Sequence, residues 1–403
     1  MEGVHREELP ALRVDAAVTA TRRELFRWSG LAAAGLAVAG VPWPELLRAA
    51  VAGAQRLRVG LIGCDSEGIG LVQDALAADP RVELVALADE HGPRVERARA
   101  VFTHRLRRGG RHRRVSIARA RCLSGAGAAA ALCALPEVDA VLLAGVPARR
   151  PEHLAAALAA GRHAYLLAPG AVDAAGCRSL DCSGREAARR GLALGAALPW
   201  RYDAQLLALH DRVRAGRLGR PVAAATAWRR GAWRRYTPGG AAEENWYFDE
   251  GLSGGFLLGD CFETVDVMSW FLGGLPESAS GRIVRDRRNP GDLASHYALE
   301  FQYPHAVPVT LEASLVPHAP LERRQRLIGS AGMVDLEPMR RLPARPPRVA
   351  AVGAFLDAVA ERDPAGRDAR RLEFDALVAG TRAAILGREA ARAGRPLDRE
   401  AVA

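Results

Sequence analysis

A regular alternation of short apolar runs with helix-forming segments, starting at residue 57, constrains the fold most strongly. Four such runs occupy residues 57–63, 82–88, 138–144 and 163–167. The segments between them carry apolar residues at helical spacing, and one begins with Pro151, a residue favoured in the first turn of a helix. Strands that alternate with helices in this way predict an α/β fold with a Rossmann-like, doubly wound parallel sheet.

The turn after the first strand resembles a dinucleotide fingerprint with one departure. A G-x-G-x-x-G turn cradles a pyrophosphate, and an acid at the end of the second strand binds the ribose. Here Gly63 and Gly68 supply the outer glycines and Asp89 the acid, but Asp65 replaces the middle glycine. Asp65 is also a good N-cap for the helix that follows. Its negative charge would oppose phosphate binding by about 1 kcal/mol or more, which weakens cofactor binding without excluding it.

Composition excludes several kinds of chemistry. The chain contains no lysine, so all 56 Lys+Arg residues are arginine, and Schiff-base chemistry and a P-loop lysine are ruled out. The net charge of +10 is concentrated in an arginine-rich run at residues 105–114. No aromatic residues interleave there to stack bases, so we expect a solvated loop and no nucleic-acid partner.

The first 54 residues are predicted to be an export leader. Thr21-Arg22-Arg23-Glu24-Leu25-Phe26-Arg27 resembles a twin-arginine motif, and the weakly hydrophobic stretch after it is too short to span a bilayer. The alternative is a chance arginine pair in an arginine-rich chain. The motif predicts a periplasmic or extracellular protein with no membrane span in the mature chain, tethered to the membrane if the leader is not cleaved. The six cysteines show no CxxC spacing, and most are expected to be buried, small residues.

From about Arg56 to Asp398 the chain resembles the Gfo/Idh/MocA group of glucose-fructose oxidoreductases and inositol dehydrogenases. The resemblance rests on these segments: 59–64 (Val-Gly-Leu-Ile-Gly-Cys), 86–89 (Ala-Leu-Ala-Asp), 135–141 (Leu-Pro-Glu-Val-Asp-Ala-Val), 150–163, 200–203 (Trp-Arg-Tyr-Asp) and 245–247 (Asn-Trp-Tyr). It implies NAD or NADP bound by a Rossmann-like domain at 55–198, with Pro147 and Pro169 at the cofactor's edge. It also implies an α+β substrate domain at 199–345 with a large, mostly antiparallel sheet, and helices at 346–403 packed back on the body.

Two chemical groups of the family are missing. The family strand ends Glu-Lys-Pro, whereas this chain has Leu167, Ala168 and Pro169. A helix in the family carries a histidine three residues before an aspartate, and here Glu263 stands before Asp266. Glu263 and Asp266 are therefore the candidate catalytic residues, and burial would have to raise the pKa of Glu263 for work at neutral pH. A different interpretation is that Asp260 and Glu263 form a capping box at the helix start.

The candidate substrate-binding residues come from the second half of the chain. By resemblance they are Arg201, Tyr202, Trp246, Tyr247 and His296. The aromatic residues suit the flat face of a sugar ring, although a core role explains them equally well. A histidine satisfied within a sheet is the safer interpretation of His296. The spacing of Asp260, Glu263 and Asp266 drifts around a helix, so no metal site is predicted.

The sequence is compatible with two hypotheses about function. The first is an exported NAD(P)-dependent oxidoreductase that transfers a hydride at a carbinol carbon of a sugar, polyol or related carbohydrate, with an NAD-assisted glycoside hydrolase as a variant. The second is a non-catalytic ligand-binding or scaffold relative that has lost the lysine and the histidine. In either case the partner is a small carbohydrate-like molecule, and a homo-oligomer formed through the large sheet is a further prediction.

Overall fold

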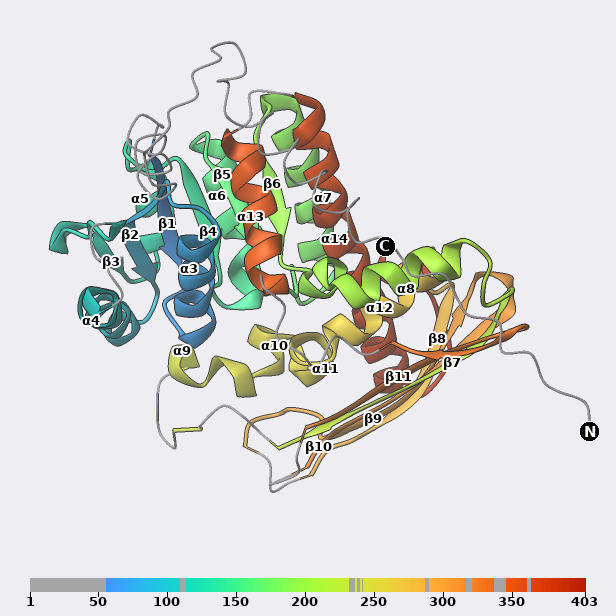
Figure 1. Ribbon diagram of the computed structural model, residues 1–403. Coiled ribbons are helices and arrows are strands. Elements are labelled where there is room, and N and C mark those ends of the chain that lie inside the picture. Colours follow the sequence, from blue (N-terminus) through green and yellow to red (C-terminus); the bar gives the residue numbers. More distant parts are fainter. Residues whose placement is uncertain are drawn as a thin grey trace, which may run out of the picture. The chain divides into compact units, whose positions relative to one another are not determined.

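The computed structural model describes residues 56–108, 114–231, 236–237, 240, 242–286, 290–316, 321–336, 346–360 and 364–403. These residues belong to one compact unit, Arg56–Ala403 (Figure 1). The predicted export leader lies outside them, as do residues 109–113 of the arginine-rich run.

The first sheet is parallel and has six strands in the order β3-β2-β1-β4-β5-β6. Its strands are β1 Leu57–Ile62, β2 Val82–Asp89, β3 Cys122–Ser124, β4 Ala140–Leu143, β5 His163–Leu166 and β6 Leu194–Ala196. Its helices are α3 Ser66–Ala78, α4 Gly92–Arg108, α5 Ala128–Ala134, α6 Arg150–Ala159 and α7 Ala174–Arg190. β4 is buried along its whole length, as expected for a strand covered on both faces. The strand order confirms the predicted Rossmann-like sheet.

The second sheet has seven strands in the order β12-β11-β7-β10-β9-β8-β13. They are β7 Pro221–Arg230, β8 Ser278–Val284, β9 His296–Tyr303, β10 Val307–Leu315, β11 Glu322–Gly329, β12 Gly332–Asp335 and β13 Leu397–Asp398. Only β10 and β7 pair in parallel, so the predicted large, mostly antiparallel sheet is confirmed. Burial alternates along β9, with Tyr297, Leu299, Phe301 and Tyr303 on the covered face.

Shorter helices lie in the segments between these strands. They are η3 Pro147–Arg149, η4 Pro199–Tyr202, α8 Ala204–Arg214, α9 Ala242–Asn245, η5 Trp246–Phe248, α10 Glu250–Ser253, α11 Gly255–Gly259 and α12 Phe262–Leu272. Of these, η4 and α8 are the ones that connect the first sheet to the second. The remaining one-turn segments are η2 Arg119–Arg121, η6 Pro304–Ala306 and η7 Arg399–Val402. None of the described helices is long and apolar enough to cross a membrane.

The last two helices, α13 Pro347–Ala360 and α14 Pro364–Ala393, pack against the first sheet and its helices (Figure 1). α13 contacts α3 and η4, and buries Val352, Phe355 and Leu356. α14 contacts α7 and β6 and also reaches β8, β9 and α12. One long helix thus contacts elements of both sheets.

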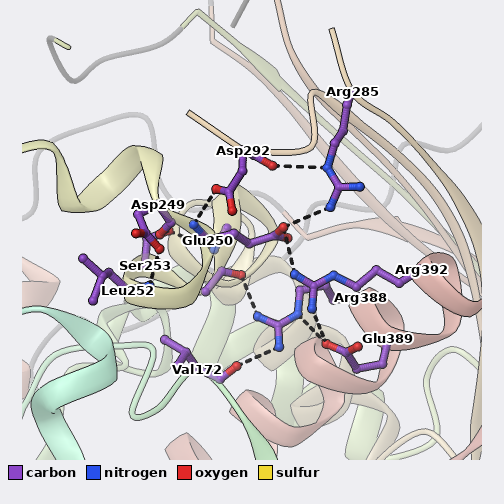
Figure 2. Close-up of polar contacts among 12 residues, drawn as sticks. Val172, Asp249, Glu250, Leu252, Ser253, Arg285, Asp292, Arg388, Glu389 and Arg392 are labelled. Atoms are coloured by element: carbon purple, nitrogen blue, oxygen red, sulfur yellow. Dashed lines mark hydrogen bonds and ion pairs between the residues drawn. The ribbon is translucent and has the colours of Figure 1, made fainter. Parts of the chain in front are cut away.

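A buried polar network near the end of α14 adds to this connection (Figure 2). The guanidinium of Arg388, only 4% exposed, donates to the carbonyl of Val172 at 2.7 Å and to that of Gly254 at 3.0 Å. The buried Glu250 carboxylate lies 2.8 Å from Arg392 of the same helix and 3.2 Å from Arg285. Charged groups buried this deeply are tolerated because each has partners. The network therefore joins α14 to the segment after β5 and to the start of α11.

The six cysteines are free thiols in the described chain. Cys64, Cys133, Cys177 and Cys261 are buried, Cys122 is half-buried and Cys182 is exposed. The expectation that most of them serve as small buried residues is confirmed.

Candidate active site

The turn between β1 and α3 requires glycine at both predicted positions. Gly63 has φ +97°, and a Cβ atom there would lie 2.1 Å from the backbone nitrogen of Gly145. A Cβ atom on Gly68 would lie 1.9 Å from the carbonyl oxygen of Gly63. Both contacts are far below van der Waals distance, so only glycine lets the turn close against β4 and lets α3 approach β1. This backbone geometry matches a dinucleotide-binding turn.

Asp65 caps α3 as predicted. Its Oδ1 atom accepts hydrogen bonds from the backbone N–H groups of Glu67 at 3.0 Å and Gly68 at 3.1 Å. These are donors at a helix N-terminus, the type of group that binds phosphate in a Rossmann fold. A side chain of this protein therefore already occupies donors that a pyrophosphate would use.

Asp89 ends β2 and is buried, with 8% of its surface exposed. Its Oδ2 accepts from the backbone N–H of Cys64 at 2.7 Å, and its Oδ1 accepts from that of His91 at 2.8 Å. Arg94 lies 3.6 Å from the same Oδ1 atom. Asp89 thus ties the β1 turn to the β2 turn, in the position from which an acid contacts a ribose.

A groove beside this turn, named here the turn groove, extends along the carboxyl ends of β1, β2 and β4. Its lining includes Gly63, Asp65, Asp89, Arg94, Val146, Arg149, His153 and Trp246. The free space is about 20 Å³, room for roughly one water molecule. Arg149 spans the groove to Glu90, with 3.5 Å between Nε and Oε1. A nucleotide can enter only if side chains such as these move apart.

Arg150 organises the loops that follow β4 and β5, a role the sequence did not reveal. Only 1% exposed, it donates to the carbonyl of Gly145 at 2.8 Å, to that of Leu167 at 3.1 Å and to that of Pro169 at 2.6 Å. The Ala168–Pro169 peptide bond is cis. The predicted cofactor-edge residue Pro147 is buried in η3, next to Val146 of the turn groove.

A second opening, named here the central cleft, is lined in part by the first turns of α3. It has a free volume of about 470 Å³, within the range of ligand pockets. Its lining includes Ser66, Glu67, Leu167, Ala168, Trp228, Arg230, Asp260, Glu263, Arg323 and Arg348. Leu167 and Ala168 therefore face the cleft with no ionisable group, in the positions where the family carries glutamate and lysine.

Glu263 lies in the central cleft in the first turn of α12. Its side chain keeps 37% of its surface exposed, and its carboxylate lies 3.9 Å from the guanidinium of Arg323. Burial raises the pKa of Glu263, and the positive charge of Arg323 opposes that shift. A carboxyl group with a raised pKa in a cleft suits general acid–base chemistry.

The capping-box interpretation of Asp260 and Glu263 is wrong. The N-cap of α12 is Cys261 and not Asp260, and the Cys261 side chain makes no capping hydrogen bond. Asp260 instead accepts a hydrogen bond from the Tyr247 hydroxyl at 2.5 Å and lies 3.6 Å from Arg230. These partners come from η5 and β7, so tertiary contacts override the local capping pattern.

Asp266 and Arg201, predicted for two different roles, bind each other. Arg201 donates to the two carboxylate oxygens of Asp266 at 2.7 and 3.0 Å, and Asp266 is 3% exposed. Burial raises the pKa of Asp266, and Arg201 counteracts it. Neither residue is among those lining the central cleft. A bidentate pair of this kind positions α12 against η4, so a catalytic role for Asp266 stays a prediction that the geometry does not favour.

Three other predicted substrate residues have structural partners. The Tyr202 hydroxyl donates to Glu373 of α14. Trp246 and Tyr247 are buried with Phe248 and Leu293, although Trp246 also lines the turn groove. Through Asp260, Tyr247 supports the wall of the central cleft.

His296, the remaining predicted substrate residue, does not line the central cleft. His296 lies on the face of the second sheet opposite the buried Tyr297, and its Nδ1 is 2.6 Å from Ser314 Oγ. It lines an open depression there with Thr310 and Glu312. Alternation along β9 turns His296 away from the core, as the sheet-histidine interpretation supposed. Among the described residues, no cluster of three or more His, Cys, Asp or Glu residues is placed to hold a metal ion.

The described chain thus combines a glycine-containing turn on a parallel, Rossmann-like sheet with a cleft partly lined by β7 and β11 of a second, mostly antiparallel sheet. Comparison with known proteins agrees. Residues 206–335 match the family model of the GFO/IDH/MocA C-terminal domain. The inositol 2-dehydrogenase of Pseudomonas savastanoi pv. phaseolicola is 36% identical over 92 residues, which is 23% of this chain and 27% of that enzyme. The match thus spans about a quarter of the curated relative.

Solved structures extend the likeness to the rest of the fold. GenD2 from gentamicin A biosynthesis, solved with NAD, is 18% identical, with a TM-score of 0.65 over 86% of this chain and 97% of its own. An oxidoreductase domain protein from Kribbella flavida is 16% identical, with a TM-score of 0.68 over 86% of this chain and 99% of its own. Scyllo-inositol dehydrogenase from Lactobacillus casei, solved with NAD(H) and scyllo-inositol, is 16% identical, with a TM-score of 0.61 over 86% of this chain and 100% of its own. These structures share the fold of this chain, and the family model matches its residues 206–335, so the comparisons confirm the predicted resemblance to Gfo/Idh/MocA proteins.

Proposed function

We propose that this protein is a nicotinamide-dinucleotide-dependent oxidoreductase acting on a hydroxyl group of a sugar, polyol or related carbohydrate. One arrangement carries the proposal. The turn groove and the central cleft are both lined by residues of the turn between β1 and α3, since Asp65 lines the first and Ser66 and Glu67 line the second. This turn would hold the dinucleotide, with Asp89 as the ribose acceptor. Solved relatives with this fold contain NAD or NAD(H).

The residues of the turn fit a dinucleotide in backbone shape. Gly63 allows the tight turn and Gly68 the close packing of α3 on β1 that a dinucleotide turn requires, and Asp89 stands where a ribose acceptor belongs. Pro147 and Pro169 lie in the loops after β4 and β5 that border the same edge of the sheet. Asp65 opposes binding, because its carboxylate holds two amide donors and adds negative charge. We therefore expect binding that is weaker than that of a turn with three glycines.

A bound dinucleotide supplies the hydride acceptor, and the chain supplies the proton acceptor. Glu263 is the carboxylate of α12 that reaches the central cleft, so it takes the proton of the carbinol hydroxyl. Leu167 and Ala168 contribute apolar surface only, since neither side chain can transfer a proton. General bases contribute about 10²–10⁴-fold to a rate, so a single carboxylate supports slower turnover than a complete lysine and histidine relay.

Turnover assays with Glu263→Gln test this function. Wild-type protein is incubated with NAD⁺ or NADP⁺ and a panel of polyols, sugars and sugar acids, and formation of the reduced cofactor is followed. We expect turnover with at least one substrate, a loss of about 10²–10⁴-fold in kcat for Glu263→Gln, and an unchanged dinucleotide affinity. Glu186→Gln is the matched control, because Glu186 is an α7 residue paired with Arg189. Equal rates for Glu263→Gln and wild type would contradict the role of Glu263.

A non-catalytic binding protein is the second candidate. Two observations favour it: the Asp65 cap and the apolar Leu167–Ala168 wall of the cleft. Saturable dinucleotide binding without turnover across the panel would select this candidate. Release of free sugar from glycosides in the presence of catalytic NAD⁺ would instead indicate the NAD-assisted hydrolase variant.

Export by the twin-arginine route and assembly through the large sheet are also proposed. The support for export is the Thr21–Arg27 motif and the apolar stretch behind it. Replacing Arg22 and Arg23 together by Gln tests export, with the expected result that the protein accumulates in the cytoplasm. Sedimentation of the mature chain tests the homo-oligomer.

A further inference from the structure

One arginine of the central cleft differs from its neighbours. Arg323 lies on β11 opposite Trp228 of β7, on the covered face of the sheet. Its guanidinium lies over the ring of Trp200, 4.6 Å from the centroid, and its side chain is 28% exposed. The next residue, Arg324, points to the other face, is 77% exposed and pairs with Glu322. Strand alternation therefore directs Arg323, and not Arg324, into the cleft.

Arg323 also has unused hydrogen-bonding capacity. The other two cleft arginines pair with carboxylates, since Arg348 is 3.0 Å from Asp74 and Arg230 is 3.6 Å from Asp260. In the described part of the chain, the polar partner of Arg323 is Glu263, at 3.9 Å. That distance is too long for a hydrogen bond. A guanidinium carries five N–H donors, and those of Arg323 remain available to a ligand oxygen placed beside Glu263.

We propose that Arg323 is a catalytic residue that contacts the substrate: it donates to the oxygen of the reacting carbinol, next to Glu263, in a cleft without lysine. This inference rests on the proposed function. In the step, the carbinol C–H bond breaks and its hydride goes to the dinucleotide. The O–H bond breaks and its proton goes to a Glu263 carboxylate oxygen, while a C=O bond forms. Arg323 keeps its protons throughout, because a guanidinium does not deprotonate in proteins.

The physical basis is electrostatic. Negative charge grows on the carbinol oxygen as the proton leaves, and a fixed cation in a partly dry cleft stabilises that charge. Stacking on Trp200 holds the guanidinium plane, so little reorganisation is needed. A planar fork can contact two adjacent oxygens at once, which suits a vicinal diol of a sugar or polyol.

The charged groups around Glu263 predict how its titration responds. Arg323 of β11 and Arg348 of α13 lower the pKa of Glu263, whereas burial, Asp266 of α12 and Glu67 of α3 raise it. Asp260 lies in the same cleft wall. Loss of a nearby positive charge destabilises the carboxylate, so removing Arg323 raises the pKa of Glu263 further. The acid limb of the pH–rate profile should then move to higher pH.

The experiment compares Arg323→Gln, Arg323→Lys and the control Arg324→Gln. For Arg323→Gln we expect kcat to fall about 10²–10³-fold, the acid limb to move to higher pH, and the dinucleotide Kd to stay within about twofold. Arg323→Lys should recover part of the rate and return the acid limb of the pH–rate profile to its wild-type position. Arg324→Gln should behave as wild type. Carboxyl-carbon NMR of Glu263 should show the same upward pKa shift in Arg323→Gln.

Two negative outcomes are separable. Turnover of Arg323→Gln equal to that of Arg324→Gln, with the same limb, overturns the role of Arg323 and leaves the proposed function intact. Failure of wild-type protein to bind a dinucleotide or to turn over any substrate overturns the proposed function and this inference together. In that case the Glu263 titration still shows whether the two side chains interact.

Discussion

Asp65 and Gly68 are joined by a hydrogen bond of 3.1 Å from the backbone N–H of Gly68 to the Asp65 carboxylate. Gly68 is the residue whose missing Cβ lets α3 approach β1. The bond therefore places a negative charge on the N-terminal donors of a helix whose geometry suits a phosphate. This conflict between a suitable backbone and an unsuitable side chain is the main functional feature of the turn.

Replacing Asp65 with Gly should strengthen dinucleotide binding. The change frees two amide donors and removes a charge that costs a phosphate about 1 kcal/mol, so Kd should fall about fivefold or more. Calorimetric titration with NAD(H) and NADP(H) measures this. Asp173→Gly is the matched control, since Asp173 caps α7 through the N–H of Gly176. If both variants bind as wild type does, Asp65 does not limit binding.

His153 should make the fold sensitive to acid. Burial lowers its pKa to about 4, and its Nδ1 has no hydrogen-bond partner within the described chain. The unfolded chain binds a proton near pH 6.5 that the folded chain does not bind. The free energy of unfolding is therefore unaffected by His153 above pH 6.5. It falls by up to about 3 kcal/mol as the pH is lowered from 6.5 toward 4.

Urea unfolding of wild type and His153→Leu between pH 4 and 7 checks this. The wild-type free energy of unfolding should carry a slope of up to about 1.4 kcal/mol per pH unit in this window that the variant lacks. Parallel curves for the two proteins would show that His153 does not titrate in this way.

Arg388→Met should destabilise the fold strongly. The variant leaves the carbonyls of Val172 and Gly254 without their donor in a buried place and breaks a charge network, for a loss of about 3–5 kcal/mol. Arg189→Met is the comparison, because Arg189 is 73% exposed in its pair with Glu186 and should cost under about 1 kcal/mol. Chemical unfolding of wild type and both variants measures these losses in the free energy of unfolding. A loss for Arg388→Met as small as that for Arg189→Met would show that the network contributes little to stability.

Much of the fold could be predicted from sequence because it depends on local signals. The strands around Val59, Leu87 and Leu142 are apolar runs buried on both sides, and Asp65 stands one residue before its helix. Such patterns need no knowledge of distant contacts. The Rossmann-like sheet, the second sheet and the α3 cap were therefore all predicted correctly.

The central cleft could be predicted only in part, because its geometry depends on contacts between distant segments. The sequence predicts Asp260 as a helix cap, but in the structure Asp260 accepts a hydrogen bond from Tyr247 and pairs with Arg230. Asp266 and Arg201, predicted for separate roles, bind each other. Arg323 and Arg388 carry no sequence signal in a chain with 56 basic residues, all arginine. The inward direction of Arg323 follows from the register of β11, which becomes visible only when that strand pairs with β7.

Dinucleotide binding is the most direct test of the central proposal. Purified protein is titrated with NAD⁺, NADH, NADP⁺ and NADPH by calorimetry, and thermal unfolding is followed at the same concentrations, since a ligand of the native state must stabilise it. The predicted result is saturable binding of one dinucleotide per chain with a rise in Tm. Absence of both heat and stabilisation for all four nucleotides at millimolar concentration would contradict the proposal that this turn holds a cofactor.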